Sequence, residues 1–179
     1  MFSGFGGRCV LVVGDVMLDE HIQGLVRRLS PEAPVPIVEI QSRHYHPGGA
    51  ANVAVNIASL GGGALLAGVI GGDVAGARLC EELSSRAVQP DYLIPAADRR
   101  TTTKSRVIGG GQHIVRFDED CRIDLSPEEE DTLTNRAAEL AREADACILS
   151  DYAKGVVTSK VCQAVIGGVL KKDSHRGGS

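Results

Sequence analysis

The sequence predicts an α/β protein in which helices cover both faces of a mostly parallel sheet, giving three layers. Three continuous apolar runs, at 9–13, 64–70 and 146–150, are typical of parallel strands that are buried on both faces. Stretches with apolar residues at helical spacing separate these runs, which favours parallel strands joined by crossover helices. The chain of 179 residues is long enough for one domain of ordinary size.

The first third of the chain shows the strongest interruptions of this pattern. Its opening strand ends at Gly14-Asp15, and a polar stretch follows over 19–30. Residues 35–41 are expected to be extended, and the prolines around them suit an edge or lid strand better than a central one. The run His46-Pro47-Gly48-Gly49 then breaks the chain before an alanine-rich helix expected over 50–60, which Gly61 ends.

The rest of the chain continues the alternation of strands and helices. Glycines 109–111 lie between two extended pieces and indicate a hairpin. Ser126, Pro127 and the acids that follow are typical of a helix start. The expected elements are a helix over 74–87, a short strand over 91–94, hairpin strands over 101–108 and 113–118, and helices over 126–144 and 158–170. We predict one domain over 1–170 with lid segments inserted at about 19–46 and 100–118, and a polar tail over 171–179.

Composition and charge exclude several classes of protein. The net charge of −4 and the pI of about 5.7 argue against a nucleic-acid-binding domain, which should be basic. No apolar run is long enough to span a membrane, and residues 1–8 lack a signal-peptide pattern, so we expect a cytoplasmic protein. The five cysteines are scattered and odd in number, which favours reduced thiols over a disulfide framework or a zinc site.

Candidate ligand-binding residues gather where the parallel strands are expected to end. Open parallel sheets bind ligands at this edge, where Asp15, Asp151 and the Gly48-Gly49 helix start fall. Amides at a helix N-terminus bind hydroxyls or anions, and Asn52 lies in that first turn. Asp15 and Asp19 offer acceptors for vicinal hydroxyls, so the set points to a polyhydroxylated ligand such as a sugar. Each residue alone also fits a turn or capping role.

The predicted hairpin gathers cations on one face. With the turn centred in the glycine triplet, Lys104 is expected opposite Arg116, and Arg106 opposite Ile114. Lys104 and Arg106 would share a face, because side chains alternate along a strand. Like charges across a hairpin either splay into water or hold an anion, such as a substrate phosphate, between them. Lys154, in the loop after the last strand, is expected either to reach the substrate or to be a solvated loop lysine.

Four segments together resemble a known family. They are Val-Gly-Asp-Val-Met-Leu-Asp at 13–19, Ser-Pro-Glu-Ala-Pro-Val-Pro at 30–36, Pro-Gly-Gly-Ala-Ala-Asn-Val-Ala at 47–54 and Ser-Asp-Tyr-Ala-Lys-Gly at 150–155. The third segment, with Gly61 and Gly71 after it, resembles the N-terminal signature of the ribokinase-like (phosphofructokinase-B-type) carbohydrate kinases. All four, over about residues 9–170, are similar to the kinase domain of the bacterial heptose 7-phosphate kinases / ADP-heptose synthases.

The resemblance implies a role for each matching position. Asp19, Gly48, Gly49 and Asn52 would hold sugar hydroxyls, and Asp15 would line the same pocket. The extended segments would form a β-lid that closes over the sugar and mediates a homodimer. The implied reaction transfers the γ-phosphoryl group of ATP, with Mg²⁺, to the anomeric hydroxyl of D-glycero-D-manno-heptose 7-phosphate. Its product leads to ADP-heptose and the lipopolysaccharide core.

The chain also departs from the family's pattern. The Gly-Ala-Gly-Asp segment that carries the family's catalytic aspartate and the Asn-x-x-Glu magnesium motif do not occur in these 179 residues. The resemblance therefore implies a truncated form, the sugar-binding half of a kinase, with no catalytic or metal-binding residue of its own. The alternative is a non-catalytic sugar-phosphate-binding or oligomerising remnant. A nicotinamide-dependent oxidoreductase is disfavoured, because no G-x-G-x-x-G follows the first strand.

Overall fold

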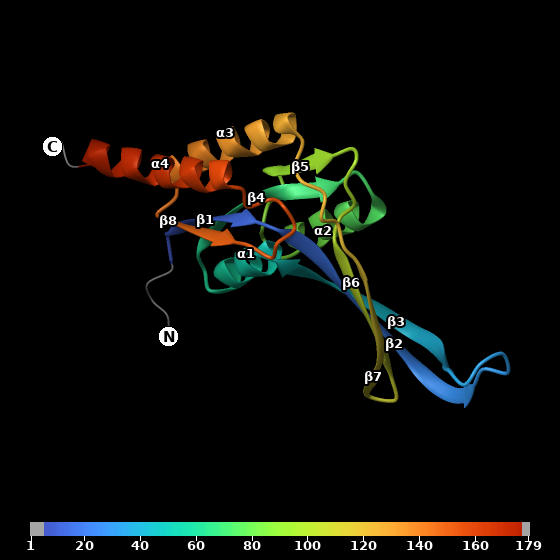
Figure 1. The fold of residues 1–179 in the computed structure, drawn as a ribbon. Helices are drawn as coiled ribbons and strands as arrows, with labels where there is room; N and C mark the ends of the chain where they lie inside the picture. The colour runs from blue at the N-terminus through green and yellow to red at the C-terminus, as the bar shows by residue number, and fades with distance from the viewer. Residues whose placement is uncertain (1–5, 177–179) are drawn as a thin grey trace.

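A parallel sheet forms the middle layer of the molecule (Figure 1). The computed structural model describes residues 6–176, and the side chains of residues 6–171. The strand order is β5-β4-β1-β8, with β1 over Cys9–Gly14, β4 over Gly63–Gly71, β5 over Leu93–Ala96 and β8 over Ala146–Ser150. The predicted three-layer α/β fold is confirmed, and each predicted buried strand is found.

Two pairs of helices cover the sheet on opposite faces (Figure 1). On one face lie α1 (Ala50–Ser59) and α2 (Val74–Ser84), and on the other lie α3 (Pro127–Glu143) and α4 (Ser159–Arg176). The side chains of β1 alternate between the two cores: Val10 and Val12 pack toward α1 and α2, and Leu11 and Val13 toward α3 and α4. An unbroken apolar run is therefore what a strand between two helical layers requires.

The helix ends show which local predictions were sound. The helix start predicted at Ser126 and Pro127 is confirmed, and Ser126 and Glu129 also form a capping box there. Helix α4 continues to Arg176, beyond the end expected at Leu170, so most of the expected polar tail is helical. The last part of that tail, 177–179, lies outside the described residues. Among the described helices, none is long and apolar enough to cross a membrane.

A second sheet extends from one edge of the core as a lid (Figure 1). It contains β2 (Val16–Leu29), β3 (Pro36–Gly49), β6 (Thr103–Gly109) and β7 (Gln112–Glu119), in the order β3-β2-β6-β7. Strand β2 runs antiparallel to β3 and parallel to β6. The polar stretch over 19–30 is thus largely a strand. Its composition does not indicate a strand, because much of the lid lies outside the hydrophobic core.

The register predicted for the hairpin was wrong. Lys104 lies opposite Asp118, not Arg116, and Arg106 lies opposite Arg116, not Ile114. The turn has two residues, Gly110 and Gly111, both with positive φ. A bulge also shifts the pairing of the two strands between Val107 and Ile108. Together they shift the pairing by two residues, so each side chain keeps its predicted face while its partner changes.

The lid has two faces of opposite character, because side chains alternate along each strand and paired residues share a face. We call one the polar face and the other the apolar face. The polar face carries Asp19, His21, His46, Lys104, Arg106, Arg116 and Asp118. The apolar face carries Ile22, Val38, Ile40, Val107, Val115 and Phe117.

Candidate sugar-binding site

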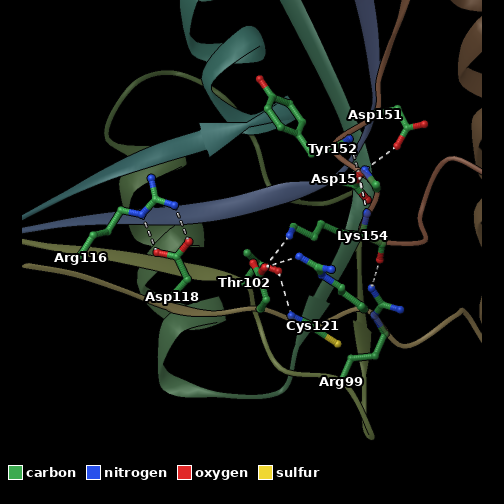
Figure 2. Close-up of polar contacts among 12 residues, drawn as sticks. Asp15, Arg99, Thr102, Arg116, Asp118, Cys121, Asp151, Tyr152 and Lys154 are labelled. Atoms are coloured by element: carbon green, nitrogen blue, oxygen red, sulfur yellow. Dashed lines mark hydrogen bonds and ion pairs between the residues drawn. The ribbon is translucent and has the colours of Figure 1, made fainter.

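Asp15 follows β1 and lies at the floor of the site, at the carboxyl edge of the sheet. Its side chain is 1% exposed, and its oxygens accept hydrogen bonds from the backbone amides of Tyr152 (2.7 Å), Lys154 (3.2 Å) and Val156 (3.2 Å). These bonds come from the loop after β8, which Figure 2 shows folded around the carboxylate. Asp15 therefore holds this loop in place and has little capacity left for a ligand hydroxyl.

Lys154 is not a solvated loop lysine, and its contact with the substrate stays a prediction. Its side chain is buried, and its Nζ lies 2.8 Å from Oδ2 of Asp120. Figure 2 shows it pointing toward the segment of Thr102 and Cys121. The Lys154 ammonium, which donates to the Asp120 carboxylate, holds the pKa of that carboxyl below its usual range. The Arg99 guanidinium donates to the Lys154 carbonyl (2.8 Å), so the lysine anchors the loop between two segments.

The tip of the same loop is exposed and carries Asp151 and Tyr152. The Asp151 Oδ1 accepts a hydrogen bond from the Ala153 amide (2.8 Å), where the backbone takes a positive φ of 56°. The Tyr152 ring is 49% exposed, and the Nζ of Lys104 lies 5.9 Å from its centroid. This cation–π contact joins the floor to the polar face of the lid. Tyr152 was missed from the sequence, although it directly follows Asp151.

The Gly48-Gly49 pair lies against both predicted aspartates. A Cβ on Gly48 would sit 2.6 Å from Oδ2 of Asp19, and a Cβ on Gly49 would sit 2.3 Å from the carbonyl oxygen of Asp15. Gly49 also has φ +57° and ψ −133°, a conformation that side chains disfavour. The pair lets β3 meet β2 closely and turn directly into α1, whose first amide, of Ala50, donates to the Asp15 carbonyl (2.9 Å).

Helix α1 begins beside this glycine pair, and no described side chain caps it. Its cap residue is Gly49, and Asn52 lies exposed in the first turn. A helix start without a side-chain cap presents amide donors to a ligand. The structure therefore places Asn52, Gly48 and Gly49 at the edge where Asp19 begins the lid.

The two arginines of the polar face each form an ion pair with a carboxylate. Arg106 pairs with Asp19 at 2.6 Å, and Arg116 pairs with Asp118 at 3.0 Å. The two arginines are partners across the hairpin, where like charges alone would be unfavourable, and each has its own carboxylate. Among the described side chains, no carboxylate lies within ion-pair distance of the Lys104 ammonium. Figure 2 shows Arg116 and Asp118 out on the lid, away from Asp15.

Two histidines on the polar face were also missed. His21 and His46 have ring centroids 5.4 Å apart in an edge-to-face arrangement. Burial, together with the nearby positive charge of Arg106 and the ring of His46, lowers the pKa of His21. The alternation Asp19-x-His21 would have indicated a shared face had the polar stretch been recognised as a strand.

The resemblance implies magnesium, which would need protein ligands at this site. Across 6–171, the part of the chain with described side chains, no three His, Cys, Asp or Glu side chains gather closely enough to hold a metal ion. We therefore derive no step through magnesium or ATP from these residues.

The sequence profile of the pfkB family carbohydrate kinases matches residues 8–167. The chain belongs to this family.

Curated relatives are similar to this chain over most of its length. The bifunctional protein HldE of Methylobacillus flagellatus is 45% identical over 158 residues, covering 88% of this chain and 32% of the relative. HldE of Caulobacter sp. (strain K31) is 46% identical over 164 residues, covering 90% of this chain and 33% of the relative. The chain thus spans about a third of the length of these relatives.

Solved structures share the fold. Phosphofructokinase-2 from Escherichia coli in complex with potassium matches with a TM-score of 0.65 and 23% identity, covering 92% of this chain and 51% of that chain. Arabidopsis thaliana ribokinase complexed with ribose and ATP matches with a TM-score of 0.60 and 18% identity, covering 93% and 51%. The match therefore spans about half of the length of each of these two solved chains.

Proposed function

We propose that this chain is the sugar-binding part of a carbohydrate kinase whose substrate is a phosphorylated heptose. The observation that carries the proposal is the position of Asp19. Its carboxylate lies between Gly48 and Arg106, where the start of α1 meets the polar face of the lid. Sugar recognition needs acceptors for hydroxyls beside backbone donors, and a phosphorylated sugar also needs cations.

Each element of this edge has a separate task in the proposal. Asp19 and the amides at the start of α1 bind hydroxyls of the sugar, with Asn52 donating and accepting from the first turn. Lys104 and Arg106 attract the phosphate of the substrate. Asp15, Asp151 and Lys154 act indirectly, by fixing the loop that carries Tyr152.

The kinase reaction itself is inferred from the family. The HldE relatives and the resemblance to heptose 7-phosphate kinases support transfer of the ATP γ-phosphoryl group to the anomeric hydroxyl of heptose 7-phosphate. Because ATP is the donor, we place the reaction in the cytoplasm. The 179 residues contain neither the Gly-Ala-Gly-Asp nor the Asn-x-x-Glu segment, so we expect this polypeptide to bind the sugar phosphate without transferring phosphate.

Calorimetric titration of the 179-residue protein with D-glycero-D-manno-heptose 7-phosphate and, separately, with ATP tests this proposal. We expect the sugar phosphate to bind, and Asp19→Asn to weaken it by about tenfold or more, the cost of a charge-assisted hydrogen bond. Asp98→Asn, at an exposed position, is the matched control. Unchanged affinity in Asp19→Asn, or turnover approaching about 1 s⁻¹ in a phosphorylation assay, would contradict the proposal.

The apolar face of the lid supports a homodimer. Ile40, Val115 and Phe117 are each about half exposed there, and they line a groove of about 590 Å³. Exposed apolar surface of this kind marks an interaction site, and in a two-fold dimer this face would pack against its copy. We expect sedimentation to show a dimer that Phe117→Lys dissociates. Leu60→Lys, at an exposed leucine just after α1, should leave the dimer intact. A wild-type monomer would overturn this part of the proposal.

A further inference from the structure

His21 and His46 are two of the histidines on the polar face, and a histidine can change charge near neutral pH. His21 on β2 is half-buried and His46 on β3 is exposed, with their rings 5.4 Å apart. In the register of the lid, His21 pairs with Arg106 and His46 pairs with Asp19. The rings therefore stand directly beside the residues to which the proposed function assigns sugar and phosphate binding.

The surroundings of His21 are mostly cationic or titratable. Burial and the adjacent Arg106 disfavour a proton on its ring, and Asp19 partly offsets them. An anion placed at this face would reverse that balance, because each protonated ring could donate a charge-assisted hydrogen bond to it. The groups facing His21 are Asp19 on its own strand, His44 and His46 on β3, Arg106 on β6 and His113 on β7.

We propose that His21 and His46 form a proton-linked contact for the phosphate of the sugar substrate, taking up a proton from solvent when the dianion binds. This inference rests on the proposed function, since it names a second pair of residues for the same phosphate. The proton binds to an imidazole nitrogen, and the resulting N–H group donates a hydrogen bond to a phosphate oxygen. No bond of the substrate is made or broken.

The direction of the pH dependence follows from the two titrations. The lowered pKa of His21 leaves its ring neutral at about pH 8 in the free protein, so a protonated contact with the dianion requires proton uptake. A phosphate monoester loses its second proton with a pKa of about 6, so it stays mainly dianionic down to about pH 6.5. Between these values the affinity for the sugar phosphate rises as the pH falls, and we expect it to rise about fivefold to tenfold.

The test is calorimetry of the 179-residue protein with D-glycero-D-manno-heptose 7-phosphate at about pH 8 and about pH 6.5, in two buffers of different ionisation enthalpy. The difference between buffers gives the protons taken up on binding. The double variant His21→Gln/His46→Gln should show neither the tightening nor the uptake. His46→Arg, with a fixed charge, should bind at the higher pH nearly as tightly as wild type does at the lower.

A matched control lies on the same strand and face. His44→Gln removes an imidazole whose Nε2 already lies 3.1 Å from the Ser42 hydroxyl, and it should keep the wild-type pH dependence. Thermal unfolding checks that each variant is folded. Binding of the sugar phosphate without proton uptake would overturn the histidine proposal and leave the sugar site standing. Equal loss of uptake in His44→Gln would also overturn it, and absence of binding at both pH values would overturn both proposals.

Discussion

The floor of the site and its lid each contribute an aspartate, and the two aspartates differ in what surrounds them. Asp15 is fully buried, and three backbone amides bind its carboxylate. Asp19, four positions later, is one-quarter exposed and pairs with Arg106 across the lid. The same residue type therefore builds the scaffold at one position and remains accessible to a ligand at the other. Sequence spacing alone cannot separate these roles, whereas the hydrogen-bond partners can.

Replacing Asp15 should have the largest effect on stability. Asp15→Ala leaves three amides of the loop without an acceptor, and we expect a loss of about 3 kcal/mol in the free energy of unfolding. Chemical denaturation measures this loss. Asp19→Ala, at a partly exposed ion pair of the lid, should cost less than about 1 kcal/mol. Equal losses in the two variants would remove the distinction between floor and lid.

The glycine pair joins the two regions, and its second member should be nearly as sensitive. Gly49→Ala forces a side chain into a glycine conformation and against the Asp15 carbonyl, so we expect a loss of about 2 kcal/mol. Gly61→Ala is the control, because Gly61 also has a positive φ but open space around it. It should cost about 1 kcal/mol. A Gly49 variant as stable as the Gly61 variant would show that the close approach is not needed.

Replacing Arg106 should weaken binding of the sugar phosphate and leave the stability of the fold nearly unchanged. Arg106→Gln breaks the pair with Asp19 on a partly solvated face, so the free energy of unfolding should change by less than about 1 kcal/mol. Affinity for the sugar phosphate should fall about tenfold, because a charged donor to the phosphate is lost. Arg100→Gln, at an exposed pair with Glu119, should change neither quantity. If calorimetry shows an unchanged affinity in Arg106→Gln, the phosphate of the sugar does not bind beside Arg106.

The smallest expected effect is a pH dependence of stability that involves Glu20 on strand β2 of the lid. Burial raises the pKa of Glu20, but hydrogen bonds from Ser105 (2.6 Å) and Arg43 (2.5 Å) outweigh it and hold the pKa below the ordinary value of 4.5. A carboxyl with a lowered native pKa adds stability above its unfolded pKa, and this stability is lost as the pH falls through the native pKa.

Wild type should therefore lose more stability than Glu20→Gln when the pH falls from about 5 to about 3, by at most about 1 kcal/mol. Thermal unfolding at the two pH values measures the difference. Parallel loss in the two proteins would mean that Glu20 does not contribute.

The sequence predicted the core far better than the lid. Strands β1, β4 and β8 are continuous apolar runs because helices cover both of their faces, and that pattern is visible without a structure. Strand β2 has no such pattern beyond its first residues, since one lid face is polar and the other is half exposed. The hairpin register depended on a bulge, which no residue type in 101–118 specifies.

The position of the site in the fold could be predicted from the sequence, whereas the binding roles of its residues stay predictions. Asp19, Gly48, Gly49 and Asn52 meet at the expected edge, because the carboxyl ends of parallel strands converge there. The ion pair of the buried Lys154 with Asp120 joins residues far apart in the chain, and only the folded structure brings them together.

The most direct measurement is a crystal structure of the protein soaked with D-glycero-D-manno-heptose 7-phosphate. Sugar hydroxyls within hydrogen-bond distance of Asp19 and Asn52, with the phosphate beside Lys104 and Arg106, are the predicted result. A sugar bound remote from Asp19 and Asn52 would contradict the account.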